Sequence, residues 1–125
     1  MAYVPYNENP FERNTVDCTV RAIALFLDSD WDTQYARLSV YGFMKKDMTV
    51  ANNLWMGYLR SLGYKAREIP DMCPDCYTVK EFCMDHPKGR YLLGTEGHVV
   101  AVVNGDYYDT WDSGEEIPLF FWERS

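Results

Sequence analysis

The sequence contains no apolar stretch that approaches the roughly 20 residues of a membrane-spanning helix. Its first eight residues, Met1 to Glu8, have neither the basic region nor the apolar run of a secretory signal. Internal repeats and low-complexity segments are also missing. These absences predict a soluble protein that does not partner a membrane and that works in the cytoplasm of a bacterium or of an infected host cell.

Basic side chains are scarce as well, since 12 Lys and Arg residues stand against 19 Asp and Glu residues and give a formal net charge of -7. Proteins that bind nucleic-acid phosphates usually carry a basic face, so this balance argues against a nucleic-acid partner. Four cysteines are present. In a cytoplasmic chain they are expected to be reduced rather than paired in disulfides.

What the chain does contain is enough apolar material for one core. Hydrophobic residues make up 47% and aromatic residues 16% of its 125 positions. A chain of this length and composition predicts a single folded domain spanning residues 1–125.

The hydrophobic pattern changes period along the chain. Helical spacing is found first and strand-like runs follow in the last third. Residues 1–14 contain several breakers and are expected to form an irregular arm. The expected helices cover residues 17–27, 31–41, 50–62 and 78–86, and the expected strands cover 64–69, 90–93, 98–103, 106–111 and 117–122. This order predicts an α+β fold, in which N-terminal helices with a buried central helix pack on a C-terminal antiparallel sheet.

The helix expected at residues 17–27 is apolar around nearly its whole circumference, which is typical of a central, buried helix. Asp17, or Thr15 before it, can cap its start. Cys18 would then lie in the first turn, where the helix dipole favours a thiolate and therefore a nucleophile. Alternatively, Cys18 only packs, because free cysteines are among the most buried residues.

A histidine and a carboxylate follow at a spacing that favours a shared site. Asn104-Gly105 is a strong two-residue hairpin signal, so Val103 should pair with Asp106. In that register His98 and Asp109 lie on one face of the sheet as diagonal neighbours, and Asp112 lies on the other face. Asp109 could then orient the imidazole of His98 as a base for a nucleophile.

The order Cys18, His98, Asp109 and the helix-then-sheet layout resemble the papain-like cysteine peptidases. The run from His98 to Val102 resembles the segment that begins at the family's histidine, and Asp109-Thr110-Trp111 resembles its Asn-Ser-Trp. Asp17-Cys18 followed by Ala22 resembles the bacterial double-glycine leader peptidases. The D-C-x-x-R-A-I-A run resembles small phage and bacterial proteins. The resemblance implies a papain-like fold and a Cys-His-Asp triad that acts on a protein or peptide substrate without a cofactor.

The sequence departs from that family at the oxyanion hole. Papain-like enzymes carry a Gln about six residues before the cysteine, and Glu12 stands at that position. An ionised carboxylate cannot donate a hydrogen bond. Asn14 is the nearest amide and is our candidate donor, together with the backbone N–H of Cys18. Because of Glu12, a second hypothesis stays open: a catalytically inactive papain-like protein, encoded by a phage, that binds a host protein.

A competing cluster consists of Cys73, Cys76, Cys83 and His86, whose residue types suit a zinc ion. Only six residues separate Cys76 from Cys83, which is fewer than in common zinc modules. Cys83 and His86 also fall within an expected helix, where Cys83 can be a core residue. We therefore expect no metal site, and the zinc set is the alternative to that expectation.

Overall fold

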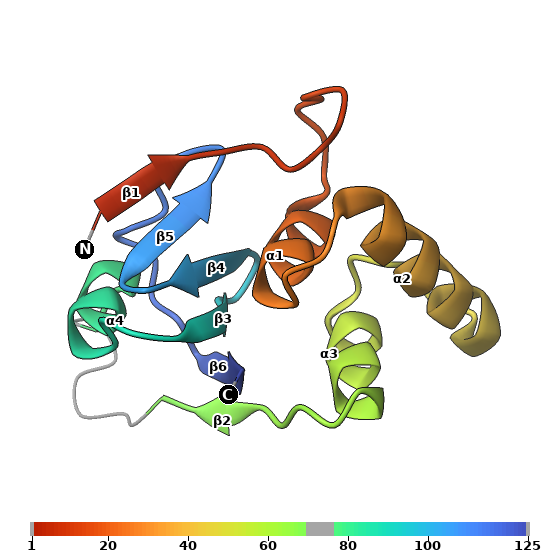
Figure 1. Ribbon diagram of the computed structural model, residues 1–125. Coiled ribbons are helices and arrows are strands. Elements are labelled where there is room, and N and C mark those ends of the chain that lie inside the picture. Colours follow the sequence, from red (N-terminus) through yellow and green to blue (C-terminus); the bar gives the residue numbers. More distant parts are fainter. Residues whose placement is uncertain (1, 70–76, 125) are drawn as a thin grey trace.

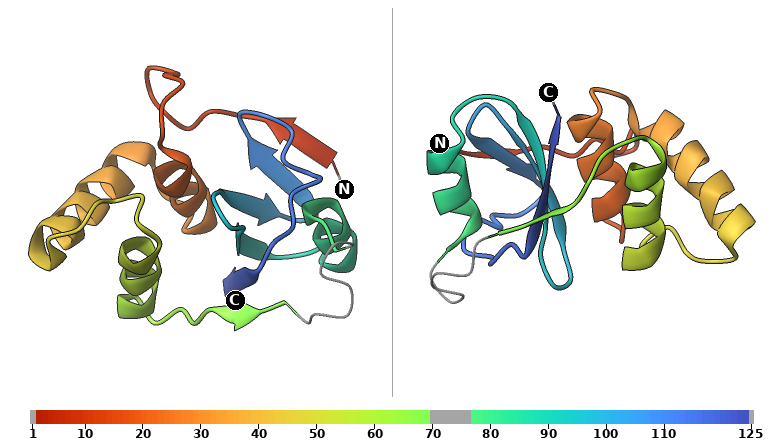
Figure 2. Two further views of the ribbon diagram at one scale, coloured as in Figure 1. Left: turned by 180° about the vertical axis from the view of Figure 1, so that it is seen from behind. Right: turned by 90° about the horizontal axis from the view of Figure 1, so that it is seen from below.

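Three layers build the molecule, with a mixed β-sheet in the middle (Figures 1 and 2). The computed structural model describes residues 2–69 and 77–124. Its helices are α1 (Cys18–Phe26), α2 (Trp31–Lys45), α3 (Asn52–Ser61) and α4 (Val79–Asp85). Its strands are β1 (Ala2–Pro5), β2 (Arg67–Glu68), β3 (Arg90–Gly94), β4 (Val99–Val103), β5 (Asp106–Asp109) and β6 (Phe120–Arg124). The sheet order is β1-β5-β4-β3-β6-β2.

The α+β class is confirmed, and the helices divide between the two faces of the sheet. Figure 2 shows α1, α2 and α3 on one side and α4 on the other. Each side has its own apolar cluster, one centred on Ile23 and Trp122 and the other on Phe82 and Tyr107. None of the helices in the described part of the chain has the length and apolar content to cross a bilayer.

The prediction of an irregular N-terminal arm is wrong for its first residues. β1 pairs in parallel with β5, so the sheet is not entirely antiparallel as expected. The ring of Tyr3 stacks on that of Tyr107 with centroids 5.6 Å apart, which fastens this edge strand. Pro5 does not prevent pairing, because an edge strand tolerates a missing N–H. β1 therefore runs beside Asp109 and delivers the following loop to the candidate site.

The hairpin register is confirmed. Asn104 and Gly105 have φ values of 51° and 81°, as a tight turn between twisted strands requires. Val103 pairs with Asp106, and Ala101 pairs with Tyr108. This pairing carries Asp109 to the end of β5 next to the start of β4, where His98 lies.

Helix α1 is the buried central helix that the pattern predicted. Seven of its nine residues are buried, including the polar Thr19 and Arg21. Asp17 occupies the N-cap position, but its side chain makes no capping hydrogen bond. The carboxylate of Asp17 instead accepts a bond from Arg21 Nε at 2.7 Å. The helix start is thus held by a buried ion pair rather than by the expected side-chain cap.

Candidate active site

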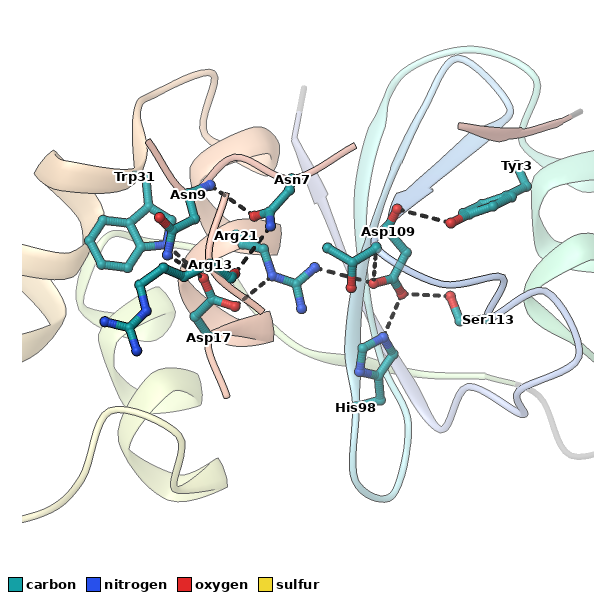
Figure 3. A network of polar contacts seen from close by, with 11 residues as sticks. Tyr3, Asn7, Asn9, Arg13, Asp17, Arg21, Trp31, His98, Asp109 and Ser113 are labelled. Atoms are coloured by element: carbon teal, nitrogen blue, oxygen red, sulfur yellow. Dashed lines mark hydrogen bonds and ion pairs between the residues drawn. The ribbon is translucent and has the colours of Figure 1, made fainter. Parts of the chain in front are cut away.

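The structure brings Cys18, His98 and Asp109 together from three separate elements. Cys18 is the first residue of α1, His98 directly precedes β4, and Asp109 ends β5. His98 Nε2 lies 2.5 Å from Asp109 Oδ2 (Figure 3). This contact leaves Nδ1 as the ring nitrogen available to the thiol. The arrangement has the nucleophile, base and orienting carboxylate that covalent acyl chemistry needs.

Asp109 is held as a carboxylate by four donors. Its Oδ2 accepts bonds from His98 and from Ser113 Oγ at 2.7 Å. Its Oδ1 accepts bonds from Arg21 Nη1 at 3.2 Å and from the backbone N–H of Thr110 at 2.8 Å. Burial alone would raise the pKa of Asp109, but the bonds from His98 and Ser113 and the charge of His98 lower it below its ordinary value. Asp109 is therefore a fixed, negative partner for the imidazole.

His98 is held in its protonated form. Burial alone would lower the pKa of His98, but its bonds to Asp109 and Cys18, with their negative charges, raise it to about 9. The backbone of the same residue is also fixed, since the N–H of Thr95 donates to the carbonyl of His98 at 2.8 Å. At neutral pH this environment favours an imidazolium in one orientation.

The surroundings of Cys18 favour ionisation of its thiol. Its side chain is half-buried, and burial alone would raise its pKa. Hydrogen bonding to His98, the charge of His98 and the backbone of Val99 act in the opposite direction and lower the pKa of Cys18 below its ordinary value. Cys18 and His98 therefore favour a thiolate–imidazolium pair, the reactive form of a nucleophilic cysteine.

Trp111 covers the histidine. The two ring centroids lie 4.8 Å apart, and the planes are tilted by 42°. A ring packed against the imidazole reduces its contact with water, and electrostatic interactions such as that between His98 and Asp109 are stronger where water is scarce.

Arg21 is the central residue that the sequence reading missed. It is 7% exposed and lies between two carboxylates, bonding Asp17 through Nε and Asp109 through Nη1 (Figure 3). Asp17 also accepts bonds from Trp31 Nε1 at 3.0 Å and from Asn9 Nδ2 at 3.3 Å. The spacing of Asp17 and Arg21, four residues apart on one helix, was the available signal. The network fixes α1, and with it Cys18, relative to β5.

The predicted oxyanion donor is not brought into this network. Asn14 is exposed, and none of the hydrogen bonds described for residues 2–69 and 77–124 involves its side chain. Glu12 is exposed too and lies in a turn with a φ of 52°. Of the donors we predicted, the backbone N–H of Cys18 at the helix start is the one placed beside the thiol.

Glu8 lies in the loop between β1 and α1, where the charges of Arg21, Asp109 and Asp17 act on its carboxyl group. Its Oε1 is buried without a hydrogen-bond partner among the described residues. Burial raises the pKa of Glu8 to about 7, with Asp109 and Asp17 adding to the rise and Arg21 opposing it. Glu8 therefore takes up a proton near neutral pH, next to the groups that orient the thiol.

Replacing Glu8 by Gln should remove a pH-dependent loss of stability. Because folding raises the pKa of Glu8 from 4.5 to about 7, its contribution is fully present below about pH 4.5 and is lost as the pH rises through about 7. The change that Glu8→Gln causes in the free energy of unfolding should be more stabilising at about pH 8 than at about pH 5, by roughly 2–3 kcal/mol. Urea unfolding at both pH values measures this difference. The exposed Glu12→Gln is the matched control, and the same pH dependence in both variants would contradict the assignment.

Of the alternative zinc set, the structure describes Cys83 and His86. Cys73 and Cys76 lie outside the described residues. Cys83 is 1% exposed, and burial raises its pKa to about 12. His86 stacks on Phe82 with centroids 3.9 Å apart, and its Nδ1 lies 2.9 Å from the Phe82 carbonyl. Within residues 2–69 and 77–124 no group of three or more His, Cys, Asp or Glu side chains is placed to hold a metal ion.

Comparison with protein-family models, with characterised proteins and with solved structures gives no significant match for this chain. Any functional conclusion therefore depends on the geometry and chemistry of the site itself.

Proposed function

We propose that the protein is a cysteine-dependent hydrolase with a papain-like arrangement, acting on a peptide or isopeptide bond through Cys18, His98 and Asp109. The observation that carries the proposal is the buried His98–Asp109 pair beside a thiol whose pKa is lowered at the start of a helix. Reactive cysteines are found in such electropositive, partly exposed positions, whereas structural cysteines such as Cys83 are buried and inert.

The chemistry follows from these three groups. The Cys18 sulfur forms a bond to the acyl carbon, and the electron pair of the carbonyl moves to its oxygen, where the Cys18 backbone N–H donates. When the carbonyl re-forms, the bond to the leaving amine breaks and His98 donates its proton to that amine. Water, deprotonated by His98, then attacks the thioester and releases the acid and the thiolate. Asp109 keeps the imidazole oriented throughout.

Covalent labelling tests this proposal. A peptide acyl probe that reacts with activated thiols should modify Cys18, and Cys18→Ala should abolish this modification while keeping the wild-type unfolding transition. Mass spectrometry of the Cys18 peptide measures the modification. Cys83→Ala is the matched control and should keep it, since the Cys83 thiol is buried and its pKa is raised. Labelling of the Cys18 peptide no faster than that of a free thiol would overturn the proposal.

The second candidate is a binding protein on the same scaffold, favoured by the exposure of Asn14 and Glu12. Without a side-chain oxyanion donor, acyl transfer would lose roughly 10²–10³-fold in rate. This candidate predicts a thiol that reacts with small alkylating agents but shows no turnover of peptide or isopeptide substrates. Turnover that Cys18→Ala removes would exclude it.

A further inference from the structure

Helices α2 and α3 lie at the end of the molecule opposite β1 and α4 (Figure 1). Side chains of these two helices line an apolar groove. The groove encloses about 370 Å³. Its lining on α2 includes Arg37, Val40, Tyr41 and Met44. The opposite side includes Tyr58 of α3 and Leu62, which directly follows that helix. Val40 and Met44 are 59% and 68% exposed, so these side chains are left uncovered by the rest of the chain.

The sequence of α2 accounts for this uncovered face. Only Gln34, Leu38 and Gly42 of its 15 residues are buried, one stripe at a spacing of four. Val40, Phe43 and Met44 form a second apolar stripe at i, i+3 and i+4, and that stripe faces away from the body. A helix with an exposed apolar stripe beside its buried one is suited to pack against a further neighbour in addition to α1 and α3.

Along residues 33–66, which include most of α2 and all of α3, the charge has the opposite sign to that of the whole chain, although α2 also carries Asp32 in its first turn. Five of the six charged residues between positions 33 and 66 are basic, although the protein carries a net charge of -7. All five are exposed, and none forms an ion pair with any residue that the structure describes. They are Arg37, Lys45, Lys46, Arg60 and Lys65.

Two of these cations lie at the apolar surface itself. Arg37 lines the groove, and Lys45 Nζ lies 5.7 Å from the ring centroid of Tyr41, which also lines it. An apolar floor with a basic border matches a partner that presents apolar side chains on one face and carboxylates beside them.

We propose that the groove between α2 and α3 binds an acidic, amphipathic polypeptide segment of a partner protein, seating apolar side chains at i, i+3, i+4 and i+7 of that segment. The concave shape favours a segment of chain over a flat membrane surface, because the apolar side chains of two helices converge on one hollow. The site is separate from Cys18, so the test does not depend on the thiol chemistry.

Fluorescence anisotropy tests the proposal with two labelled synthetic helices. One carries Leu at i, i+3, i+4 and i+7 with Glu at most other positions, and the other has Lys in place of each Glu. The acidic helix should bind about tenfold or more tightly than the basic one at low ionic strength, and its affinity should fall as salt rises. Equal binding of the two helices would overturn the proposal.

A matched pair of variants locates the binding. Met44→Glu should weaken binding of the acidic helix about tenfold, because it places a carboxylate in the groove. Met84→Glu introduces the same change at a methionine of α4 that is 62% exposed, and it should leave binding unchanged. Equal effects of both variants would contradict the assignment. The assignment would also be contradicted if vesicles containing phosphatidylserine displaced the acidic helix from the protein. A dimer in sedimentation experiments that Met44→Glu dissociates would contradict it as well.

Discussion

Replacing His98 by Ala should slow the alkylation of Cys18 by iodoacetamide at about pH 6 by roughly 10- to 100-fold. In the wild-type protein the bond to His98 and its charge lower the pKa of the thiol, so the thiolate fraction at this pH is larger than that of an ordinary thiol. Without the imidazole, burial still raises the pKa of Cys18, and it is opposed by the backbone of Val99 and the charge of Arg21. The larger thiolate fraction of the wild-type protein is partly offset in the alkylation rate, because a less basic thiolate is a weaker nucleophile.

His86→Ala is the matched control for this experiment. His86 packs on Phe82, and its Nδ1 lies against the Phe82 carbonyl. His86 caps the C-terminal end of α4, a helix that lies on the opposite side of the sheet from α1 (Figure 2). Its removal should leave the alkylation rate of Cys18 unchanged. Equal rates for wild-type protein and His98→Ala would show that His98 does not activate the thiol.

Replacing Arg21 by Met should lower the free energy of unfolding by roughly 3–5 kcal/mol near neutral pH. Asp17 and Asp109 are 5% and 1% exposed, and both bond to the Arg21 guanidinium. Removing the cation leaves two buried carboxylates without their shared positive partner. Met keeps much of the side-chain volume, so the loss reports the charge rather than a cavity.

Urea unfolding measures this effect, and Arg67→Met supplies the control. Arg67 pairs with Glu123 at 3.8 Å on the surface, where the two side chains are 64% and 42% exposed. Such a pair contributes about 1 kcal/mol or less, so its loss should be small. A loss for Arg21→Met as small as that for Arg67→Met would contradict the structural role of the network.

Much of this arrangement could be predicted because local patterns determine it. The apolar circumference of α1 indicated a buried helix, and the Asn104-Gly105 turn specified the hairpin register. That register distinguished Asp109 from Asp112, which instead accepts bonds from the Tyr107 hydroxyl and the backbone N–H of Gly114. Two-residue hairpins allow such inference because their loop length sets the pairing.

Contacts between distant segments could not be predicted from local sequence patterns. β1 was expected to be irregular because Pro5 and the following residues break regular patterns, yet it pairs with β5, about a hundred residues later. Arg21 stands on a largely apolar helix, and its burial depends on the distant Asp109 as well as on the nearby Asp17. The role predicted for Asn14 came from its distance to Cys18 along the chain, which does not specify where a loop side chain lies.

In the proposed mechanism, Cys18 and His98 form an ion pair that is oriented by Asp109. The rate of alkylation of Cys18 between about pH 4 and pH 10, followed by mass spectrometry of the Cys18 peptide, tests it most directly. We predict an inflection below the ordinary thiol pKa of about 8.5, lost in His98→Ala. A single inflection at or above about 8.5 in the wild-type protein would contradict the account.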